Sequence, residues 1–398
     1  MIPIFLAITI RGANLEVGPG KVFARIEAAV AVANTGDTIL VYPDPSGYPG
    51  TAVRIQTPSI TIRGVNSQPV TVTGTGFDYS GAGSVPRAII QIDPTGTGAK
   101  IQNLNLSDAH NQTFNGAGIR IQAANDVTVS DCIIHGNDMG IMSNGQTDNP
   151  TAGSNQRIEY CRIEGNGNLS DPGFNHNLYL GGTSAYLSHC EVARSLTGHN
   201  VKSRTHYLQV ESCYIHDSAN REIDLPEAWD TVRPNSNAVL IGNRIVKDPN
   251  CIGNRGVVFF GKESGIRNGN LYLLCNTIVT PFSSPVILIN FQMSQVFATR
   301  NIILNSQQNQ ATLLSSPDPN QIFVPSQNMT SRGYGKLPGE NTWSKDLAEA
   351  FGLVIPPYLY PGSVPGKEIS VSWFDGNGTK QNGKAAIGMS SVVGPRSG

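Results

Sequence analysis

Most of the chain consists of short runs in which apolar and polar residues alternate. One pattern recurs within them: an apolar residue, two variable residues, a Cys or Asn, one further residue and a second apolar residue. Examples are Val-Ser-Asp-Cys132-Ile-Ile and Ile-Glu-Tyr-Cys161-Arg-Ile. Alternation with a period of two places every second side chain on one face of a strand. The pattern therefore predicts short β-strands over most of the sequence.

The same pattern returns at nearly regular intervals. Its central position is separated from the next by 23 to 32 residues, a size typical of one coil in a solenoid of stacked strands. Successive coils stack about 4.8 Å apart, so equivalent residues form ladders along the stack. We therefore predict an all-β parallel β-helix (solenoid). The central positions are Leu104, Cys132, Cys161, Cys190, Cys213, Asn243, Cys275 (with a shift of one residue) and Asn301.

The cysteines fall within this repeat. Cys132, Cys161, Cys190 and Cys213 form one predicted ladder, and Cys251 lies outside it. A buried Cys behaves as a small hydrophobic residue. We therefore interpret the ladder as packed free thiols rather than disulfides.

Helical spacing interrupts the alternation near the start of the chain. Apolar residues spaced by three and four predict an amphipathic helix over residues 22–33, and residues 1–10 read as a first strand. An open solenoid end exposes its hydrophobic interior, so this helix is expected to cap it. Residues 1–36 are thus assigned to an N-terminal strand and capping helix.

The periodicity fades after about residue 310. We therefore assign residues 37–310 to the β-helix. Residues 311–398 are rich in Pro, Gly and Ser and contain one helical stretch at residues 343–351. We interpret them as a C-terminal cap and an irregular tail packed on the solenoid.

The N-terminal segment also carries a family resemblance. Gly18-Pro-Gly-Lys21, a short helix, Gly36-Asp-Thr-Ile39 and Pro58-Ser-Ile-Thr-Ile-Arg-Gly64 resemble the entry of the pectate-lyase-like superfamily. The similarity covers roughly residues 16–310. It implies a right-handed parallel β-helix that acts on polysaccharide outside the cytoplasm, either secreted, periplasmic or at the cell surface.

Composition excludes several classes of function. The formal net charge of the 398 residues is -1 and charged residues make up 14% of them, so no basic stripe for nucleic acid is expected. No apolar run approaches the roughly 18 residues of a membrane span. The hydrophobic fraction of 39% is not that of a disordered chain.

Polar side chains concentrate on three successive coils. If Leu178, Val201 and Ile223 point inward, their neighbours form two outward columns on one sheet. Two histidines precede these columns, two arginines flank them, and a Lys two coils further extends the groove. The first column is Asn177, Asn200 and Glu222; the second is Tyr179, Lys202 and Asp224; the other residues are His176, His199, Arg204, Arg221 and Lys262.

This patch suits β-elimination on a polysaccharide that contains uronic acid. The reaction needs positive charge to neutralise the substrate carboxylate and a base to take the proton from C5. The predicted catalytic residues are Tyr179, His199, Lys202, Arg204, Glu222 and Asp224. The predicted substrate-binding residues are His176, Asn177, Asn200, Arg221 and Lys262. Tyr179 and Trp229 also offer faces on which sugar rings can stack.

Lys202-Ser203 resembles the Lys-Ser of the alginate-lyase and chondroitinase-B family, which implies that Lys202 is the base. That family has acidic calcium ligands just upstream of the Lys, where this chain has Ser195-Leu-Thr-Gly-His199. It also has an Arg on the following coil, where this chain has Asp224. Calcium binding would here have to use Asn200, Glu222 and Asp224.

Two alternatives remain open at the level of sequence. Glu222 and Asp224 could act as the acid and base of a glycoside hydrolase. The chain could instead be a carbohydrate-binding protein of the phage-tailspike kind or a structural β-helix without catalysis. An enzyme is expected to be a monomer, whereas a tailspike-like protein is expected to be a trimer.

Overall fold

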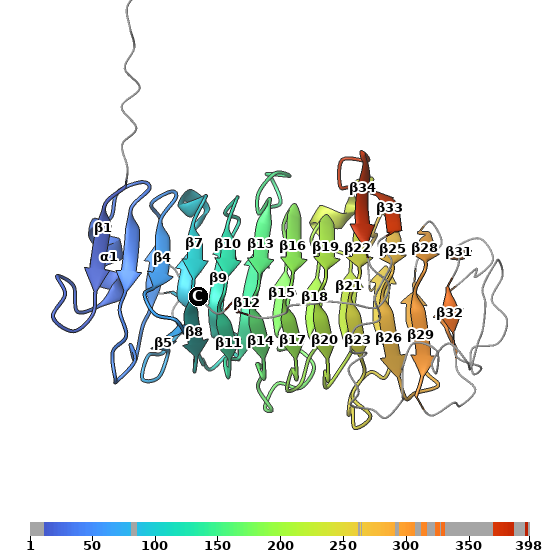
Figure 1. Cartoon of the computed structure of the whole chain (residues 1–398), viewed down its shortest axis with the longest axis horizontal. Helices are drawn as coiled ribbons and strands as arrows, with labels where there is room; N and C mark the ends of the chain where they lie inside the picture. Colours follow the sequence, from blue (N-terminus) through green and yellow to red (C-terminus); the bar gives the residue numbers. More distant parts are fainter. Residues whose placement is uncertain are drawn as a thin grey trace, which may run out of the picture.

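The computed structural model describes residues 12–80, 86–261, 263, 265–290, 294–306, 312–316, 323–326, 328–330, 369–385 and 395–396. Within them the chain winds into a stack of coils, each built of short strands (Figure 1). Strands of successive coils pair in parallel and form three long sheets, which we name A, B and C. The predicted parallel β-helix is confirmed.

Sheets A, B and C contain 12, 10 and 10 strands in the described part of the chain. Sheet A consists of β1 (Asn14–Val17), β2 (Thr38–Val41), β4 (Thr61–Gly64), β7 (Lys100–Gln102), β10 (Thr128–Ser130), β13 (Gln156–Glu159), β16 (Ser184–Ser188), β19 (Tyr207–Glu211), β22 (Ala238–Ile241), β25 (Leu271–Leu274), β28 (Val296–Thr299) and β31 (Phe323–Ser326). Sheet B consists of β3 (Val53–Ile55), β6 (Ala88–Ile92), β9 (Ala117–Gln122), β12 (Met139–Asn144), β15 (Leu178–Leu180), β18 (Val201–Ser203), β21 (Ile223–Pro226), β24 (Val258–Gly261), β27 (Ile287–Ile289) and β30 (Leu314–Ser315). Sheet C consists of β5 (Val70–Thr73), β8 (Leu104–Ser107), β11 (Ile133–His135), β14 (Arg162–Glu164), β17 (Glu191–Ala193), β20 (Tyr214–His216), β23 (Arg244–Val246), β26 (Thr277–Thr280), β29 (Ile302–Asn305) and β32 (Met329–Thr330).

The ladder position of the repeat lies at the bend between sheets A and C. The residue before it adopts a left-handed conformation, as in Asp131 (φ 56°) and Tyr160 (φ 54°), and this conformation turns the chain from one sheet into the next. The predicted position Cys275 is wrong by one residue. Cys275 is itself the left-handed residue (φ 60°), and Asn276 takes the ladder position, where it accepts hydrogen bonds from Asn243.

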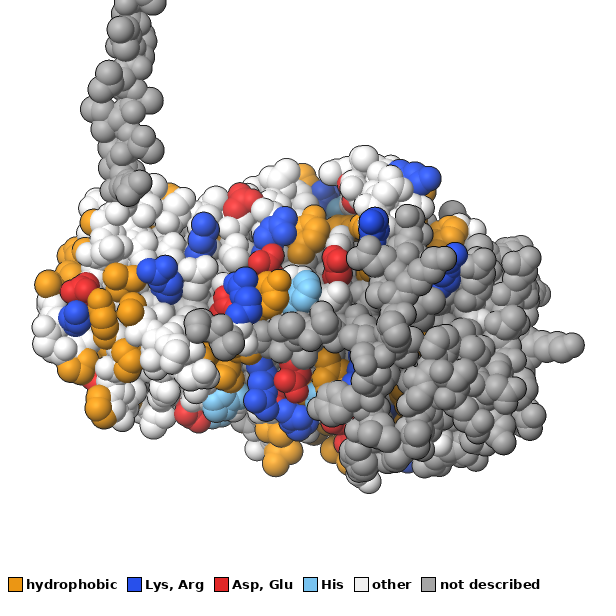
Figure 2. Space-filling view, in the orientation of Figure 1, with side chains coloured by type: hydrophobic (Ala, Val, Ile, Leu, Met, Phe, Trp, Pro, Cys, Tyr) orange, Lys and Arg blue, Asp and Glu red, His pale blue; other side chains and the backbone are white. Residues whose placement is uncertain are grey.

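Alternate strand residues fill one continuous hydrophobic interior, dominated by Ile, Val and Leu from all three sheets. All six cysteines are buried and free, which confirms the prediction of packed thiols. On the face in Figure 2, basic and acidic side chains lie side by side in the middle of the solenoid, and the described residues there form no continuous basic stripe.

Near the N-terminus, helix α1 (Ile26–Val32) is shorter than the predicted helix. Its buried side chains Ile26, Ala29 and Val30 belong to the main core, and α1 contacts β1, β2 and β3. The predicted strand at residues 1–10 lies outside the described residues. The described chain instead pairs β1 with β2. None of the helices in the described part of the chain is long and apolar enough to cross a membrane.

A C-terminal hairpin of β33 (Ile369–Phe374) and β34 (Lys380–Ala385) lies against sheet A near β22 and β25 (Figure 1, red). Trp373 packs there with Tyr272, and its Nε1 donates a hydrogen bond to the Tyr207 hydroxyl at 3.1 Å. His206 lies 2.8 Å from the carbonyl oxygen of Gly376. The hairpin thus packs on the outside of the solenoid, while the predicted helix at residues 343–351 lies outside the described residues.

Candidate active site

The second predicted column is present on the outer face of sheet B. The register pairs Tyr179 of β15 with Lys202 of β18, and Lys202 with Asp224 of β21. The intervening Leu178, Val201 and Ile223 are fully buried in the core. Two-residue alternation therefore directs the column outward, as the sequence predicted.

At this column the surface opens into a pocket of about 370 Å³, which we call the cationic pocket. It contains six of the predicted catalytic and binding residues on adjacent coils, together with further residues from the turns beside the strands. The lining residues are Gly173, Phe174, His176, Tyr179, His199, Lys202, Arg204, Asn220, Arg221, Asn254 and Glu263.

Asp224 lies beneath the pocket and holds three of its lining residues. Its carboxylate is fully buried. Oδ1 accepts a hydrogen bond from Arg221 Nη1 at 2.8 Å, and Oδ2 lies 3.3 Å from both Lys202 Nζ and His199 Nε2. A buried carboxylate is stable only when it is compensated by such charges and donors. Asp224 thus fixes the positions of groups that face the pocket.

The two histidines stack with ring centroids 5.1 Å apart. Backbone N–H groups identify their tautomers, because an N–H can only donate: His199 N donates to His176 Nδ1, and Arg221 N donates to His199 Nδ1. Each neutral ring therefore carries its proton on Nε2. Burial, reinforced by neighbouring cations, holds the pKa of both imidazoles well below the usual value.

Glu263 closes the pocket on the side of β24. Its Oε2 accepts a hydrogen bond from Arg204 Nη2 at 2.9 Å, and its Oε1 lies 3.8 Å from Lys202 Nζ. The carboxylate of Glu227 positions this loop by accepting hydrogen bonds from the backbone N–H groups of Glu263 and Gly265. Neither glutamate was assigned a catalytic or binding role from the sequence, although residues 261–263 were expected to extend the groove. Lys262, which was assigned a binding role, lies outside the described residues.

The first predicted column was expected to face outward from sheet B, and this prediction is wrong. Asn177, Asn200 and Glu222 are fully buried, because each precedes its strand at a corner where alternation does not apply. They continue an interior ladder in which Asn177 Nδ2 donates to Asn200 Oδ1 at 2.8 Å and Asn200 Nδ2 donates to Glu222 Oε2 at 2.6 Å. The structure therefore places none of the three at the pocket.

Glu222 ends the amide ladder in a buried ion pair. Its Oε1 lies 3.5 Å from Lys247 Nζ, and both side chains are fully shielded from solvent. Burial raises the pKa of Glu222, and the charge of Lys247 opposes this shift. Lys247 also donates to the carbonyl oxygens of Ser218 and Asn220. Sequence reasoning missed Lys247, since it follows β23 without any distinguishing motif.

The predicted calcium ligands do not assemble. Asn200 and Glu222 bind each other in the interior, whereas Asp224 contacts His199, Lys202 and Arg221 at the pocket. Among the described residues, no group of three or more His, Cys, Asp or Glu is arranged to hold a metal ion. The three residues therefore do not fit a shared calcium ion.

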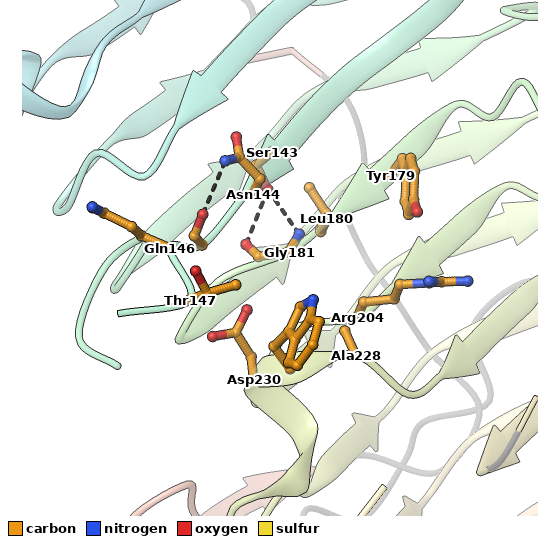
Figure 3. A pocket seen from close by; sticks show the side chains of 12 residues that line it. Ser143, Asn144, Gln146, Thr147, Tyr179, Leu180, Gly181, Arg204, Ala228 and Asp230 are labelled. Carbon is orange, nitrogen blue, oxygen red and sulfur yellow. Dashed lines mark hydrogen bonds between the residues drawn. The ribbon is translucent and has the colours of Figure 1, made fainter. Parts of the chain in front are cut away.

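A second pocket of about 170 Å³ lies at the other ends of the same strands (Figure 3). It shares Tyr179 and Arg204 with the cationic pocket. We call it the Trp229 pocket. Its lining residues are Ser143, Asn144, Gly145, Gln146, Thr147, Tyr179, Leu180, Gly181, Arg204, Ala228, Trp229 and Asp230.

Comparison with one solved structure, pectate lyase Pel9A, supports the fold. No family model and no curated protein matches the sequence. Among solved structures, pectate lyase Pel9A matches with a TM-score of 0.50 and 11% identity over 96% of this chain and 89% of its own. A PL6-family alginate lyase, AlyGC, matches with a TM-score of 0.45 and 12% identity over 97% and 57%. A pectin methylesterase from Aspergillus niger matches with a TM-score of 0.37 and 11% identity over 83% and 89%. The chain has the right-handed parallel β-helix fold of pectate-lyase-like proteins.

Proposed function

We propose that the protein is an extracytoplasmic polysaccharide lyase that cleaves a uronic-acid-containing polymer by β-elimination at the cationic pocket. One observation carries the proposal: Lys202, Arg204 and Arg221 converge on one open pocket of a chain whose net charge is only -1. Cations gathered at a concave surface attract an anionic ligand. A uronate carboxylate fits this charge.

Binding of the substrate carboxylate by Arg204 and Arg221 neutralises it and makes the proton on C5 more acidic. Charge stabilisation of this kind is commonly the largest catalytic contribution. Lys202 first releases its ammonium proton to solvent and then, as the amine, takes the C5 proton; a double bond forms between C4 and C5, and the bond from C4 to the leaving oxygen breaks. The Tyr179 hydroxyl supplies a proton to that oxygen. Tyr179 lines the same pocket, pairs in register with Lys202, and has its ring centroid 5.9 Å from Lys202 Nζ.

His176 and His199 have a supporting role in this scheme. They remain neutral, since their pKa values are held low, so they add no charge that competes with Lys202. His199 also separates Asp224 from His176 and keeps the carboxylate facing Lys202. Calcium takes no part in the proposed steps, because its predicted ligands do not share a site.

The hydrolase alternative needs the carboxylates of Glu222 and Asp224 together at one site. Glu222 faces the interior and binds Asn200 and Lys247, so it cannot serve beside Asp224 as an acid or base on substrate. Similarity to pectate lyase Pel9A supports the proposal at the level of the fold alone.

The test is an ultraviolet assay for unsaturated uronyl products on a panel of acidic polysaccharides. Lys202→Ala is compared with wild type and with Lys100→Ala, which changes an exposed lysine on sheet A. We expect activity in wild type and in Lys100→Ala and none in Lys202→Ala. A flat signal in wild type across the panel contradicts the proposal.

A further inference from the structure

Trp229 is unusual because a large aromatic side chain is exposed on a rigid support. Its exposed fraction is 79%, and it begins the short 3-10 helix η2 (Trp229–Val232). The buried Thr231 holds η2 in place: its hydroxyl bonds Ala228 and the Ile266 carbonyl oxygen. Asn268 N donates to the Thr231 carbonyl oxygen at 2.8 Å. Support of this kind under an exposed aromatic face suits ligand stacking.

The polar side chains that line the Trp229 pocket are mostly uncharged. Asn144 ends β12, Gln146 and Thr147 come from the turn that follows it, and Asp230 belongs to η2 (Figure 3). Amides, hydroxyls and a carboxylate can donate to and accept from sugar hydroxyls. The pocket thus combines one stacking face with several hydrogen-bonding groups.

The two adjoining pockets differ in charge. The cationic pocket has Lys202, Arg204 and Arg221, whereas Asp230 is the acidic residue of the Trp229 pocket. Arg204 lines both, but its Nη2 is bonded to Glu263 on the cationic side. Burial raises the pKa of Asp230 because desolvation penalises its charged form. A second carboxylate placed beside it would increase that penalty, whereas a neutral sugar would not.

The two pockets also follow each other across sheet B. Residues of the cationic pocket such as His176 and Arg221 precede their strands, while Gly181 and Asp230 of the Trp229 pocket follow theirs. Tyr179 and Arg204 form their common border. Neighbouring sugar rings of one chain can therefore occupy the two pockets in succession.

We propose that the Trp229 pocket is a subsite for a neutral sugar ring, so that the substrate is a heteropolysaccharide in which a uronic acid is linked to a neutral sugar. This inference rests on the proposed function, which places the uronate in the cationic pocket. Trp229 stacks on the C–H face of the neutral ring, and Asp230 accepts hydrogen bonds from its hydroxyls. A polymer made only of uronic acid places a carboxylate near Asp230 and binds more weakly.

Calorimetric measurement of oligosaccharide binding to the Lys202→Ala variant tests the subsite, because this variant is expected to bind the ligand without cleaving it. The probes are four hexasaccharides. Two contain only uronic acid, namely oligogalacturonate and oligomannuronate. In the other two, hyaluronan and alternating rhamnose–galacturonate, the uronic acid alternates with a neutral sugar. We expect at least one alternating hexasaccharide to bind about tenfold more tightly than both homopolymers. Adding Trp229→Ala should remove this preference, and Trp229→Phe should retain most of it. Equal affinities with and without Trp229 overturn the proposal.

Two further results separate this inference from the lyase proposal. If wild type forms unsaturated products from homopolymers and heteropolymers equally, and Trp229→Ala does the same, the lyase stands and the subsite is wrong. If no polymer yields unsaturated products but an alternating hexasaccharide still binds through Trp229, the subsite stands and the lyase is wrong. Fluorescence from the buried Trp373 should persist in the Trp229→Ala variant and serves as the internal control.

Discussion

Asp224 Oδ2 lies 3.3 Å from Lys202 Nζ, and the two residues occupy paired positions on neighbouring coils of sheet B. The carboxylate is fully shielded, while the exposed fraction of the Lys202 side chain is 13%. The stacking of coils thus places a buried acid directly beside a basic group that faces a pocket. The proposed role of Lys202 depends on this contact.

Replacing Asp224 with Asn tests that relationship. The amide retains an acceptor for Arg221 but removes the negative charge next to Lys202 and His199. We expect kcat/KM to fall on the order of 100-fold through misplacement of Lys202, and the free energy of unfolding to fall by about 2 kcal/mol. Enzyme kinetics and urea unfolding measure the two effects. Asp78→Asn, in an early turn, is the control, and unchanged kinetics in Asp224→Asn would contradict the assigned role.

Glu222→Gln separates a structural from a catalytic role. It leaves Lys247 buried without its opposite charge, so we expect the free energy of unfolding to fall by about 3 kcal/mol. Activity per folded molecule should stay within about twofold of wild type. Combining it with Lys247→Met should restore much of the stability, since the unpaired charge is then removed. If the Glu222→Gln protein is folded but inactive, Glu222 is catalytic and the structural role is wrong.

Much of this arrangement follows from sequence. The period of the repeat fixed the coils, and alternation around Leu178 and Val201 placed Tyr179, Lys202 and Asp224 in one outward column. The Asn177, Asn200 and Glu222 column was misdirected, because side-chain direction at a corner depends on the turn rather than on alternation. Asparagines at corner positions of successive coils were the available signal for an interior amide ladder.

Other parts of the site could not be read from the chain. Glu227 holds the Glu263 loop through contacts between separate turns, and no periodicity marks such contacts. The choice between Cys275 and Asn276 depended on which residue adopts the left-handed bend. Both residue types occur at ladder positions, so composition alone did not distinguish them.

The pKa of His199 predicts a loss of stability on the acid side. In the unfolded chain the imidazole titrates near pH 6.5, while in the folded protein its pKa is well below that value. As pH falls below about 6.5, the unfolded state takes up a proton that the folded state does not, so the free energy of unfolding decreases. His199→Asn can keep an acceptor for Arg221 N without titrating. Urea unfolding from pH 7 to pH 5 should therefore show a shallower loss in the variant; parallel curves would refute this assignment.

Chelation distinguishes cationic side chains from calcium as the groups that neutralise the substrate. The predicted ligands Asn200 and Glu222 bind each other, whereas Arg204 and Arg221 face the pocket. We therefore expect activity after EDTA treatment to remain within about twofold of the untreated enzyme. Loss of activity that is restored by added calcium, but not by magnesium, would contradict this expectation.

The most direct test of the central claim is the mass of the products that wild type, Lys202→Ala and Lys100→Ala form from an acidic heteropolysaccharide. Elimination predicts fragment pairs whose masses sum to that of the intact chain, with an unsaturated uronate at the new non-reducing end. We expect these from wild type and Lys100→Ala and not from Lys202→Ala. Fragment pairs that together contain one added water, or full cleavage by Lys202→Ala, would contradict a lyase that acts through Lys202.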